Sequence, residues 1–254
     1  MLKVSDVTLS YGGEPVLERV SFTVDAGEFV SLVGPSGSGK TSILRAVTNL
    51  QKPLSGSVEL TTIGQQDIGF LFQDDALLPW RTAEQNVALG LRIRGMATHE
   101  ALAQARVELA RLGLAGFEGR YPRELSGGQR KRVAIAQVLA LKPKLLLMDE
   151  PFASLDAIMR ARITQELVDW VEREHISVLL VTHDLEEALS VSDTVYLLSQ
   201  GPRAHIRSRY PVPIARPRKL LETRTHPAFA SLLDRLWKDL ADEVDNTAKR
   251  EAAA

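Results

Sequence analysis

The feature that most constrains the fold of this chain is a glycine-rich stretch, GPSGSGKTS, at residues 34–42. It follows an apolar run, Glu28 to Val33, that is typical of a buried strand, and it precedes TSILRAVTNL, which has the pattern of a helix. This order of strand, loop and helix is the P-loop arrangement, in which backbone N–H groups and a helix N-terminus surround a phosphate. The chain is therefore expected to bind a nucleoside triphosphate.

The side chains of the loop have the chemistry that a triphosphate requires. The ammonium of Lys40 can reach the β- and γ-phosphate oxygens, which also makes it a candidate catalytic group, and the Thr41 hydroxyl can bind Mg²⁺. The residues expected to bind the nucleotide here are Gly34, Pro35, Ser36, Gly37, Ser38, Gly39, Lys40, Thr41 and Ser42.

A second motif, LLLMDEP at residues 145–151, supplies carboxylates at the end of an apolar run. Open α/β sheets bind ligands beyond the carboxyl ends of their strands, which is where Asp149 and Glu150 are expected. Asp149 is predicted to hold Mg²⁺, directly or through water. Glu150 is predicted to accept a proton from the attacking water or to orient that water.

Short apolar runs alternate with helical patterns along the whole chain, which predicts an α/β fold with a mostly parallel sheet. The stretch after Gln73 is mainly helical and is expected to form a subdomain, residues 74–140, inserted in a single domain of residues 1–245. The helix expected from Thr98 to Leu114 has Thr98 as its predicted N-cap. The tail, residues 246–254, is expected to be disordered.

Composition excludes several classes of protein. The 254 residues include no cysteine, which rules out disulfides and thiolate metal sites, and the net charge of −1 gives no general attraction to nucleic acid. No window approaches the roughly 18 consecutive apolar residues of a membrane-spanning helix, and the N-terminus lacks the apolar block of a signal peptide. A soluble or peripheral membrane protein is expected.

A second glycine loop, RELSGGQRKRV at residues 123–133, also has the composition of an anion-binding segment but contains no lysine before its helix. Lys40, the pair Asp149–Glu150 and the LSGGQ sequence at residues 125–129 together resemble the ATP-binding cassette of ABC transporters. The resemblance covers nearly the whole chain. It implies a cassette fold with an N-terminal antiparallel β region, a mostly parallel core sheet and an inserted helical subdomain.

The resemblance also implies roles for residues outside the two loops. Tyr11 would stack on adenine, and Gln73 would contact Mg²⁺ and report the γ-phosphate to the transport partner. Asp156 would lie in the loop that crosses a dimer interface, with Ser154 and Leu155 before it. His183 would hydrogen-bond the γ-phosphate as a catalytic switch.

For the second glycine loop, the resemblance implies a head-to-tail homodimer in which each loop covers the ATP held by its partner. The residues expected to make this contact are Ser126, Gly127, Gly128 and Gln129. One departure from the family pattern is the pair Gln137-Val138, where related cassettes carry Arg-Ala.

The sequence DDALLPWRTAEQNV, residues 74–87, is most similar to that of the ATPases of nitrate, sulfonate and taurine importers. Membrane permease subunits are then expected to dock near Gln73 to Trp80, with a solute-binding protein acting indirectly, at the cytoplasmic face of the membrane. This apolar loop could instead belong to the core. The alternatives to an importer ATPase are a different transporter class, a soluble ABC machine and a P-loop kinase, and the sequence does not identify the cargo.

Overall fold

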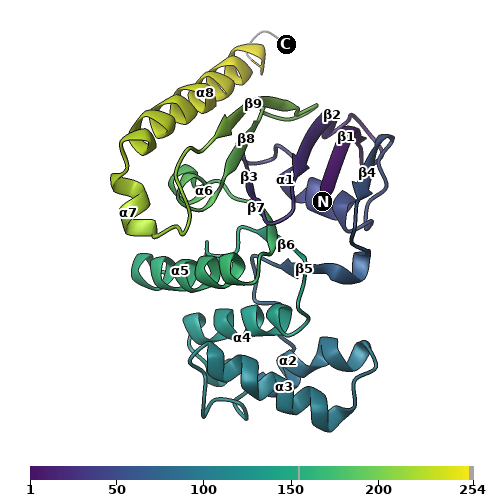
Figure 1. Cartoon of the computed structure of the whole chain (residues 1–254). Coiled ribbons are helices and arrows are strands. Elements are labelled where there is room, and N and C mark those ends of the chain that lie inside the picture. Colours follow the sequence, from purple (N-terminus) through teal and green to yellow (C-terminus); the bar gives the residue numbers. More distant parts are fainter. Residues whose placement is uncertain (154, 252–254) are drawn as a thin grey trace. The chain divides into compact units, whose positions relative to one another are not determined.

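The computed structural model describes residues 1–153 and 155–251, with side chains described as far as Glu243, and it divides into two units (Figure 1). Unit 1 comprises Met1–Gln65 and Val168–Ala254, and unit 2 comprises Gln66–Leu167. The helical insertion expected at residues 74–140 falls inside unit 2. Of the tail expected at residues 246–254, the last helix includes residues as far as Glu251, and residues 252–254 lie outside the described part.

The N-terminal part of unit 1 forms a three-stranded antiparallel sheet of β1 (Leu2–Leu9), β2 (Leu17–Val24) and β4 (Ser55–Leu60), in the order β2-β1-β4. Alternate residues of β2 are buried, so one face of the strand packs into the core. Gly56 comes so close to β1 that a Cβ atom there would lie 2.4 Å from the carbonyl oxygen of Asp6, and only glycine fits. The antiparallel N-terminal region expected for a cassette is thus confirmed.

A second ladder in unit 1 is centred on β3 (Phe29–Val33), which pairs in parallel with β7 (Ser177–Val181) and β8 (Thr194–Leu198). β9 (Ile206–Pro211) pairs antiparallel with β8. All residues of β3, β7 and β8 are buried, which explains why their sequences are mostly apolar. This parallel arrangement confirms the predicted α/β class.

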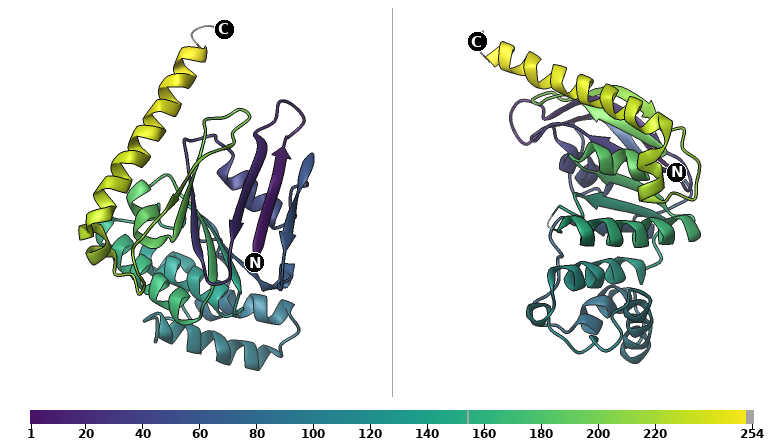
Figure 2. Two further views of the ribbon diagram at one scale, coloured as in Figure 1. Left: turned by 45° about the horizontal axis from the view of Figure 1, so that its top comes forward. Right: turned by 90° about the vertical axis from the view of Figure 1, so that its left-hand side faces the viewer.

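Four helices complete unit 1: α1 (Lys40–Val47), α6 (Leu185–Val191), α7 (Leu220–Thr225) and α8 (Pro227–Glu251). The apolar face of α8, with Phe229, Leu232 and Leu236, packs in one cluster with residues of α6, β8 and β9. α8 runs alongside β9 (Figure 2). The sequence between Pro227 and Val244 therefore forms a packing helix, as its periodicity predicts.

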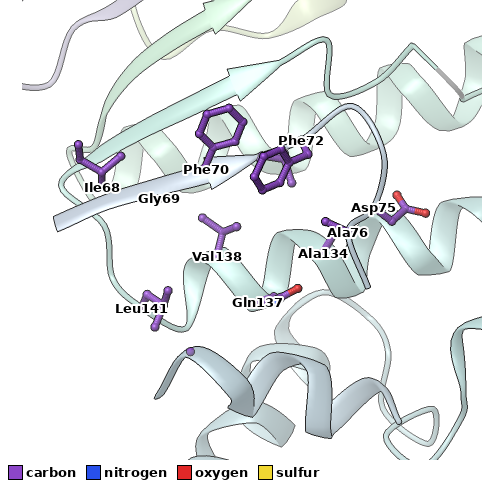
Figure 3. A pocket seen from close by; sticks show the side chains of 12 residues that line it. Ile68, Gly69, Phe70, Phe72, Asp75, Ala76, Ala134, Gln137, Val138 and Leu141 are labelled. Carbon is purple, nitrogen blue, oxygen red and sulfur yellow. The ribbon is translucent and has the colours of Figure 1, made fainter. Parts of the chain in front are cut away.

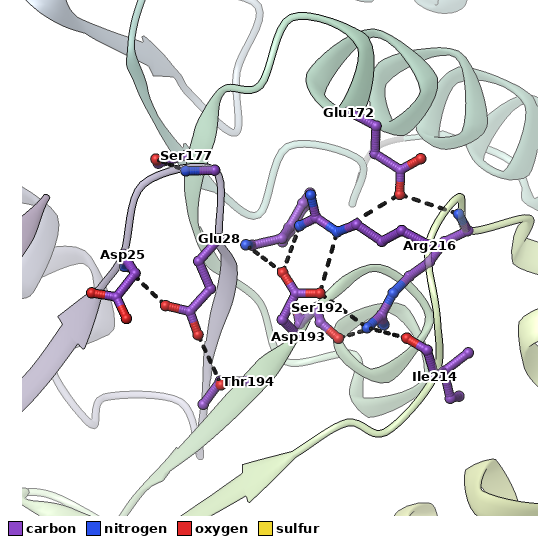
Figure 4. Close-up of polar contacts among 12 residues, drawn as sticks. Asp25, Glu28, Glu172, Ser177, Ser192, Asp193, Thr194, Ile214 and Arg216 are labelled. Carbon is purple, nitrogen blue, oxygen red and sulfur yellow. Dashed lines mark hydrogen bonds and ion pairs between the residues drawn. The ribbon is translucent and has the colours of Figure 1, made fainter.

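A charged cluster fastens the segment before α7 to the start of β8 (Figure 4). Arg216 and Arg218 both pair with Asp193, at 2.5 and 3.2 Å, and Glu172 accepts the Arg218 backbone N–H at 3.1 Å. Arg218 is 1% exposed, and burial lowers the pKa of its guanidinium while Asp193 opposes that shift. Two carboxylates facing two guanidiniums keep this buried charge balanced.

Unit 2 contains two strands and most of the helices of the middle of the chain. β5 (Ile68–Leu71), preceded by a 3₁₀ turn (Gln65–Asp67), pairs in parallel with β6 (Leu145–Asp149). The helices are α2 (Ala83–Ile93), α3 (Thr98–Arg111), the 3₁₀ turn Pro122–Glu124 and α4 (Gly127–Leu139). α5 (Ala157–Arg173) then leads along the chain from unit 2 back into unit 1.

One apolar cluster holds α2, α3 and α4 together, with Val87, Leu109 and Val133 fully buried in it. Thr82 caps α2 through a capping box with Gln85. The predicted N-cap of α3 is wrong by one residue: Ala97 occupies the N-cap without a side-chain bond, and Thr98 is already helical.

Candidate functional site

The glycine loop of unit 1 joins β3 to α1, as its sequence predicts. Gly37 and Gly39 have φ angles of 80° and 84°, in the left-handed region that favours glycine. No side chain caps the N-terminus of α1 among the described residues. The backbone N–H groups and the helix dipole at this end would both favour an anionic ligand.

Lys40 is 7% exposed, and its ammonium lies inside the loop. Its Nζ donates to the carbonyl oxygens of Gly34 at 2.9 Å and of Pro35 at 2.8 Å. The Ser38 hydroxyl is buried and has no hydrogen-bond partner among the described residues. A buried ammonium and an unpaired buried hydroxyl are both suited to phosphate oxygens.

Tyr11 follows β1 and reaches across to α1, where its hydroxyl donates to Ser42 Oγ at 3.0 Å. The side chain is 51% exposed, so a hydrogen bond holds one end of the ring while much of its surface remains open. This arrangement suits stacking against a planar base.

His183 lies in unit 1 after β7, and its side chain is exposed. The next residue, Asp184, caps α6 by accepting the Glu187 N–H at 3.0 Å. Thr182 donates to the Glu187 carboxylate at 2.6 Å. These bonds fix the main chain on both sides of the histidine.

In unit 2, Asp149 ends β6 and Glu150 follows it, both half-buried. Glu150 has a φ of 43°, a left-handed conformation that is unfavourable for a side chain with a Cβ by roughly 1–2 kcal/mol. Strained non-glycine residues of this kind occur frequently at active sites. The predicted catalytic carboxylate is thus held in a distinctive backbone conformation.

Gln73 follows β5 in unit 2, and a lysine that the sequence analysis did not single out holds its loop. Lys131 of α4 is completely buried, and its Nζ contacts the carbonyl oxygens of Phe72 at 3.3 Å and Gln73 at 3.0 Å and the Asp75 carboxylate at 3.2 Å. Three acceptors therefore satisfy the three N–H donors of this ammonium. Lys131 lies in the basic run QRKR at residues 129–132, so the local sequence carries no signal of its burial.

Ser126 is the N-cap of α4 and forms a capping box with Gln129. Its Oγ accepts the Gln129 N–H at 3.3 Å, and the Gln129 side chain accepts the Ser126 N–H at 2.9 Å. Ser126 and Gly127 are exposed, whereas Gly128 is buried: a Cβ there would lie 2.5 Å from the terminal methyl of Met159. The second glycine loop is therefore a self-capped helix end that faces outward.

Asp156 caps α5, because its Oδ1 accepts the N–H groups of Ile158 at 3.1 Å and Met159 at 3.0 Å. This structural contact accounts for one carboxylate oxygen of the residue predicted at a dimer interface. Ser154, in the same predicted loop, lies outside the described residues.

Trp80 is 70% exposed at the end of the loop after Gln73, whereas Leu77 packs against the apolar cluster of unit 2. Asn86, which the sequence analysis did not single out, is fully buried and holds this loop. Its side chain accepts the Leu78 N–H at 2.7 Å and donates to the Leu78 and Arg81 carbonyl oxygens, at 3.2 and 3.1 Å, and to that of Thr82. The sequence analysis left open that this apolar loop belongs to the core. Leu77 does pack against the core, whereas Trp80 does not.

A cavity of about 210 Å³ lies in unit 2 between β5, α2 and α4 (Figure 3). Phe70 of β5 and Phe72 just after it line the cavity on one side, and Gln137 and Val138 of α4 line it on the other. A Cβ atom on Gly69 would lie 2.6 Å from Cγ1 of Val138, so Val138 packs directly against β5. The unusual Gln137-Val138 pair therefore lines a surface cavity.

The predicted site residues thus fall in both units. Unit 1 brings together Tyr11 and the loop 34–42 and also carries His183. Unit 2 carries Gln73, Ser126–Gln129, Asp149, Glu150 and Asp156. No helix of the described residues is both long and apolar enough to cross a membrane.

Comparison with known proteins assigns the family. Residues 17–153, more than half of the chain, match the sequence profile of the ABC transporter family. The taurine import ATP-binding protein TauB of Escherichia coli O6:H1 is 41% identical over 220 residues, which cover 85% of this chain and 86% of that protein. The nitrate import ATP-binding protein NrtC of Synechocystis is 40% identical over 85% of this chain and 33% of its own length.

Solved structures agree with this assignment. The ATP-binding cassette MJ0796, in a dimeric post-hydrolysis state bound to ADP and Pi, is 33% identical, with a TM-score of 0.75 over 85% of this chain and all of that one. The cassette cbiO1 of Clostridium perfringens, part of the transporter complex cbiONQ, is 26% identical, with a TM-score of 0.74 over 89% of this chain. The chain belongs to the ABC transporter family, and within it to the ATP-binding subunits, which are ATPases.

Proposed function

We propose that this chain is the ATP-hydrolysing subunit of an importer for small solutes of the taurine, sulfonate and nitrate type. The observation that carries the enzymatic part is the glycine loop of unit 1, with Lys40 buried inside it at 2.8–2.9 Å from two loop carbonyls. The relatives at 40–41% identity are named as ATP-binding proteins for the import of taurine and of nitrate, which supports the proposed role in import.

ATP is the nucleotide that the donor set of unit 1 fits. The loop N–H groups and Lys40 would bind the β- and γ-phosphates, and Tyr11 would stack on the base. The buried Ser38 hydroxyl without a partner supports an oxygen-rich ligand at this position.

Mg²⁺ is the metal that the predicted ligands fit, because a hydroxyl, a carboxamide and a carboxylate are oxygen donors. Thr41, Gln73 and Asp149 would hold it. The described residues contain no group of three His, Cys, Asp or Glu side chains able to hold a metal. That absence agrees with an ion that takes its remaining ligands from phosphate and water, and a bound Mg²⁺ would neutralise phosphate charge.

For hydrolysis, Glu150 would accept a proton from the attacking water or orient it, and His183 would hydrogen-bond the γ-phosphate as charge develops there. The left-handed backbone of Glu150 supports a catalytic rather than a packing role.

Two copies of the chain would act together. We propose a head-to-tail homodimer in which Ser126, Gly127, Gly128 and Gln129 of one copy cover the ATP held by the other. The Oγ of Ser126 uses a lone pair to cap α4, so its hydroxyl proton remains available to donate to a phosphate oxygen. The dimeric cassette bound to ADP and Pi supports this assembly.

Membrane permease subunits would dock on unit 2 near Gln73 to Trp80, with the chain as a peripheral protein on the cytoplasmic face and a solute-binding protein acting through the permease. The exposed Trp80 and the adjacent loop, held by four hydrogen bonds to Asn86, support a preformed docking surface.

Replacing Glu150 with glutamine tests the chemistry. Glu150→Gln should bind MgATP normally but lower kcat about 10²–10⁴-fold, because the carboxylate acts only as the γ-phosphate is transferred. The variant should also accumulate as an ATP-bound dimer, measured by size-exclusion chromatography with light scattering. Turnover close to that of the wild type would refute the assignment of Glu150.

Replacing Trp80 tests docking. Trp80→Ala should leave the ATPase rate of the isolated chain within about twofold and should weaken its assembly with the co-expressed permease by about tenfold or more, as truncation of an aromatic anchor does. The matched control is Trp237→Ala, which removes another exposed tryptophan, from α8. Equal assembly by both variants would exclude Trp80 from the docking surface.

A further inference from the structure

The connection between β8 and β9, residues 199–205, lies directly against the phosphate loop of unit 1, and we call it the β8–β9 turn. A Cβ atom on Gly201 would lie 2.8 Å from the carbonyl oxygen of Gly37, closer than real Cβ atoms come. Leu198, the last residue of β8, also borders the loop: its carbonyl oxygen lies 3.0 Å from the position that a Cβ on Gly34 would take. The turn and the strand end before it therefore approach the loop at two points.

The turn also reaches Gly39 indirectly, through the segment before β2. The N–H groups of Arg203 and Ala204 donate to the carbonyl oxygens of Pro15 at 2.8 Å and Val16 at 3.0 Å. The side chain of Val16 in turn lies 2.9 Å from the position of a Cβ on Gly39. The turn thus approaches the middle of the phosphate loop directly at Gly37, and it reaches the end of the loop through Val16.

The last helix holds the turn from the other side. Glu243 of α8 accepts the Gln200 N–H at 3.2 Å and pairs with Arg207 of β9. The hydrogen bond from the Arg207 guanidinium to the Glu243 carboxylate raises the pKa of Arg207. One turn earlier on α8, Asp239 accepts the Tyr210 hydroxyl. These bonds lie on α8 and β9, outside the residues assigned to nucleotide chemistry.

We propose that α8 controls the affinity of the chain for nucleoside triphosphate by holding the β8–β9 turn against the phosphate loop, with Gly201 and Glu243 as the positioning residues. This inference rests on the proposed function of the loop. Glu243 holds the main chain of Gln200, and the next residue, Gly201, lies against Gly37 of the phosphate loop. The position of α8 would therefore affect the loop N–H groups that face a phosphate. Anything that displaces α8 would change nucleotide binding without touching a nucleotide-contacting side chain.

The expected effect is large because phosphate binding depends on the direction of backbone N–H groups. Hydrogen bonds weaken steeply as their angle falls, and a displacement of about 1 Å in a positioned group costs up to about 10²-fold. An alanine at position 201 is not strained by its own backbone, since φ there is not positive. Its methyl group must instead move the main chain of the turn or of the loop.

The first experiment compares Gly201→Ala with Gly119→Ala, a glycine with no atom within 4 Å of an added Cβ and no positive φ. Binding of a fluorescent ATP analogue to the purified chain is measured for both, together with the melting temperature without nucleotide. Gly201→Ala should raise Kd about tenfold or more, whereas Gly119→Ala should match the wild type.

The second experiment tests control by α8. Glu243→Ala removes the acceptor of the Gln200 N–H and should raise Kd and KM several-fold while kcat changes by less than about twofold, because no catalytic group is touched. Glu243→Gln keeps an acceptor oxygen and should restore part of the affinity. Asp242→Ala is the matched control, since Asp242 faces Arg207 at 3.7 Å but forms no hydrogen bond or ion pair with the turn among the described residues.

The outcomes separate the inference from the proposed function. A wild-type chain that fails to bind the ATP analogue would refute the proposed function itself. Wild-type binding with an unchanged Kd in Gly201→Ala and Glu243→Ala would overturn the inference alone. A lower melting temperature in Glu243→Ala with unchanged Kd and KM would likewise overturn it, because α8 would then only stabilise the fold.

Discussion

The two glycine loops differ in what surrounds them. In unit 1, neighbouring segments touch Gly34, Gly37 and Gly39, and the loop contains a buried lysine. In unit 2, Ser126 and Gly127 are exposed, and the serine already caps its own helix. The first loop has the parts of the phosphate site proposed above, whereas the second has donors that the proposed dimer would add to the phosphate of its partner. In that proposal one chain carries both loops, and only the first loop has to supply a lysine.

The largest expected effect comes from breaking the first loop. Lys40→Ala should lower ATP turnover about 10²–10³-fold and weaken ATP binding, because a positioned cation facing the phosphates is lost. Ser126→Arg should abolish turnover as well but leave ATP affinity of the isolated chain within about twofold. Equilibrium binding at a protein concentration too low for dimerisation separates the two. Normal ATP affinity in Lys40→Ala would contradict the comparison.

Mixing these two variants sharpens the comparison. In a head-to-tail dimer of one Lys40→Ala and one Ser126→Arg chain, one site has both defects and the other has neither. Nucleotide occlusion in the mixture should therefore exceed the sum of the two variants alone, by up to about one site per mixed dimer. Occluded ATP per dimer is measured after rapid filtration, with dimer formation checked by light scattering. Confirmed mixed dimers without a gain would mean that each chain uses its own two loops.

A smaller effect is expected from the lysine beneath the second loop's helix. Lys131→Met should destabilise the chain by about 2–3 kcal/mol, less than the 3–5 typical of a broken buried pair, because Asp75 keeps Arg130 as a partner. Arg130→Met, which changes a 40% exposed side chain, should cost under about 1 kcal/mol. Urea unfolding measures both. Equal effects would show that burial of Lys131 contributes nothing.

Local sequence patterns predict much of this molecule. The apolar run of β3, the glycines of the first loop and the start of α4 at Gly127 follow from residue order, because strands, tight loops and capped helix ends have local signatures. The predicted N-cap of α3 was wrong because the helical backbone already begins at Thr98. Ala97 therefore occupies the N-cap position, without a side-chain hydrogen bond.

Contacts between distant segments could not be predicted in the same way. Lys131 reads as one more cation in a basic stretch, and only the fold brings it to the carbonyl of Gln73. Gly201 follows a strand like many turn glycines, and its contact with Gly37 spans more than half of the chain. Such partners are set by tertiary packing, which leaves no pattern in the neighbouring residues.

The four hydrogen bonds of Asn86 have a consequence for the speed and entropy of assembly. A loose loop of five residues would lose roughly 1–2 kcal/mol of backbone conformational entropy per residue when a partner orders it. Residues 78–82 are already ordered by Asn86 before any partner arrives. Docking of the proposed permease on Trp80 would then need no folding step, so its encounter rate would be set by diffusion and orientation rather than by a conformational search.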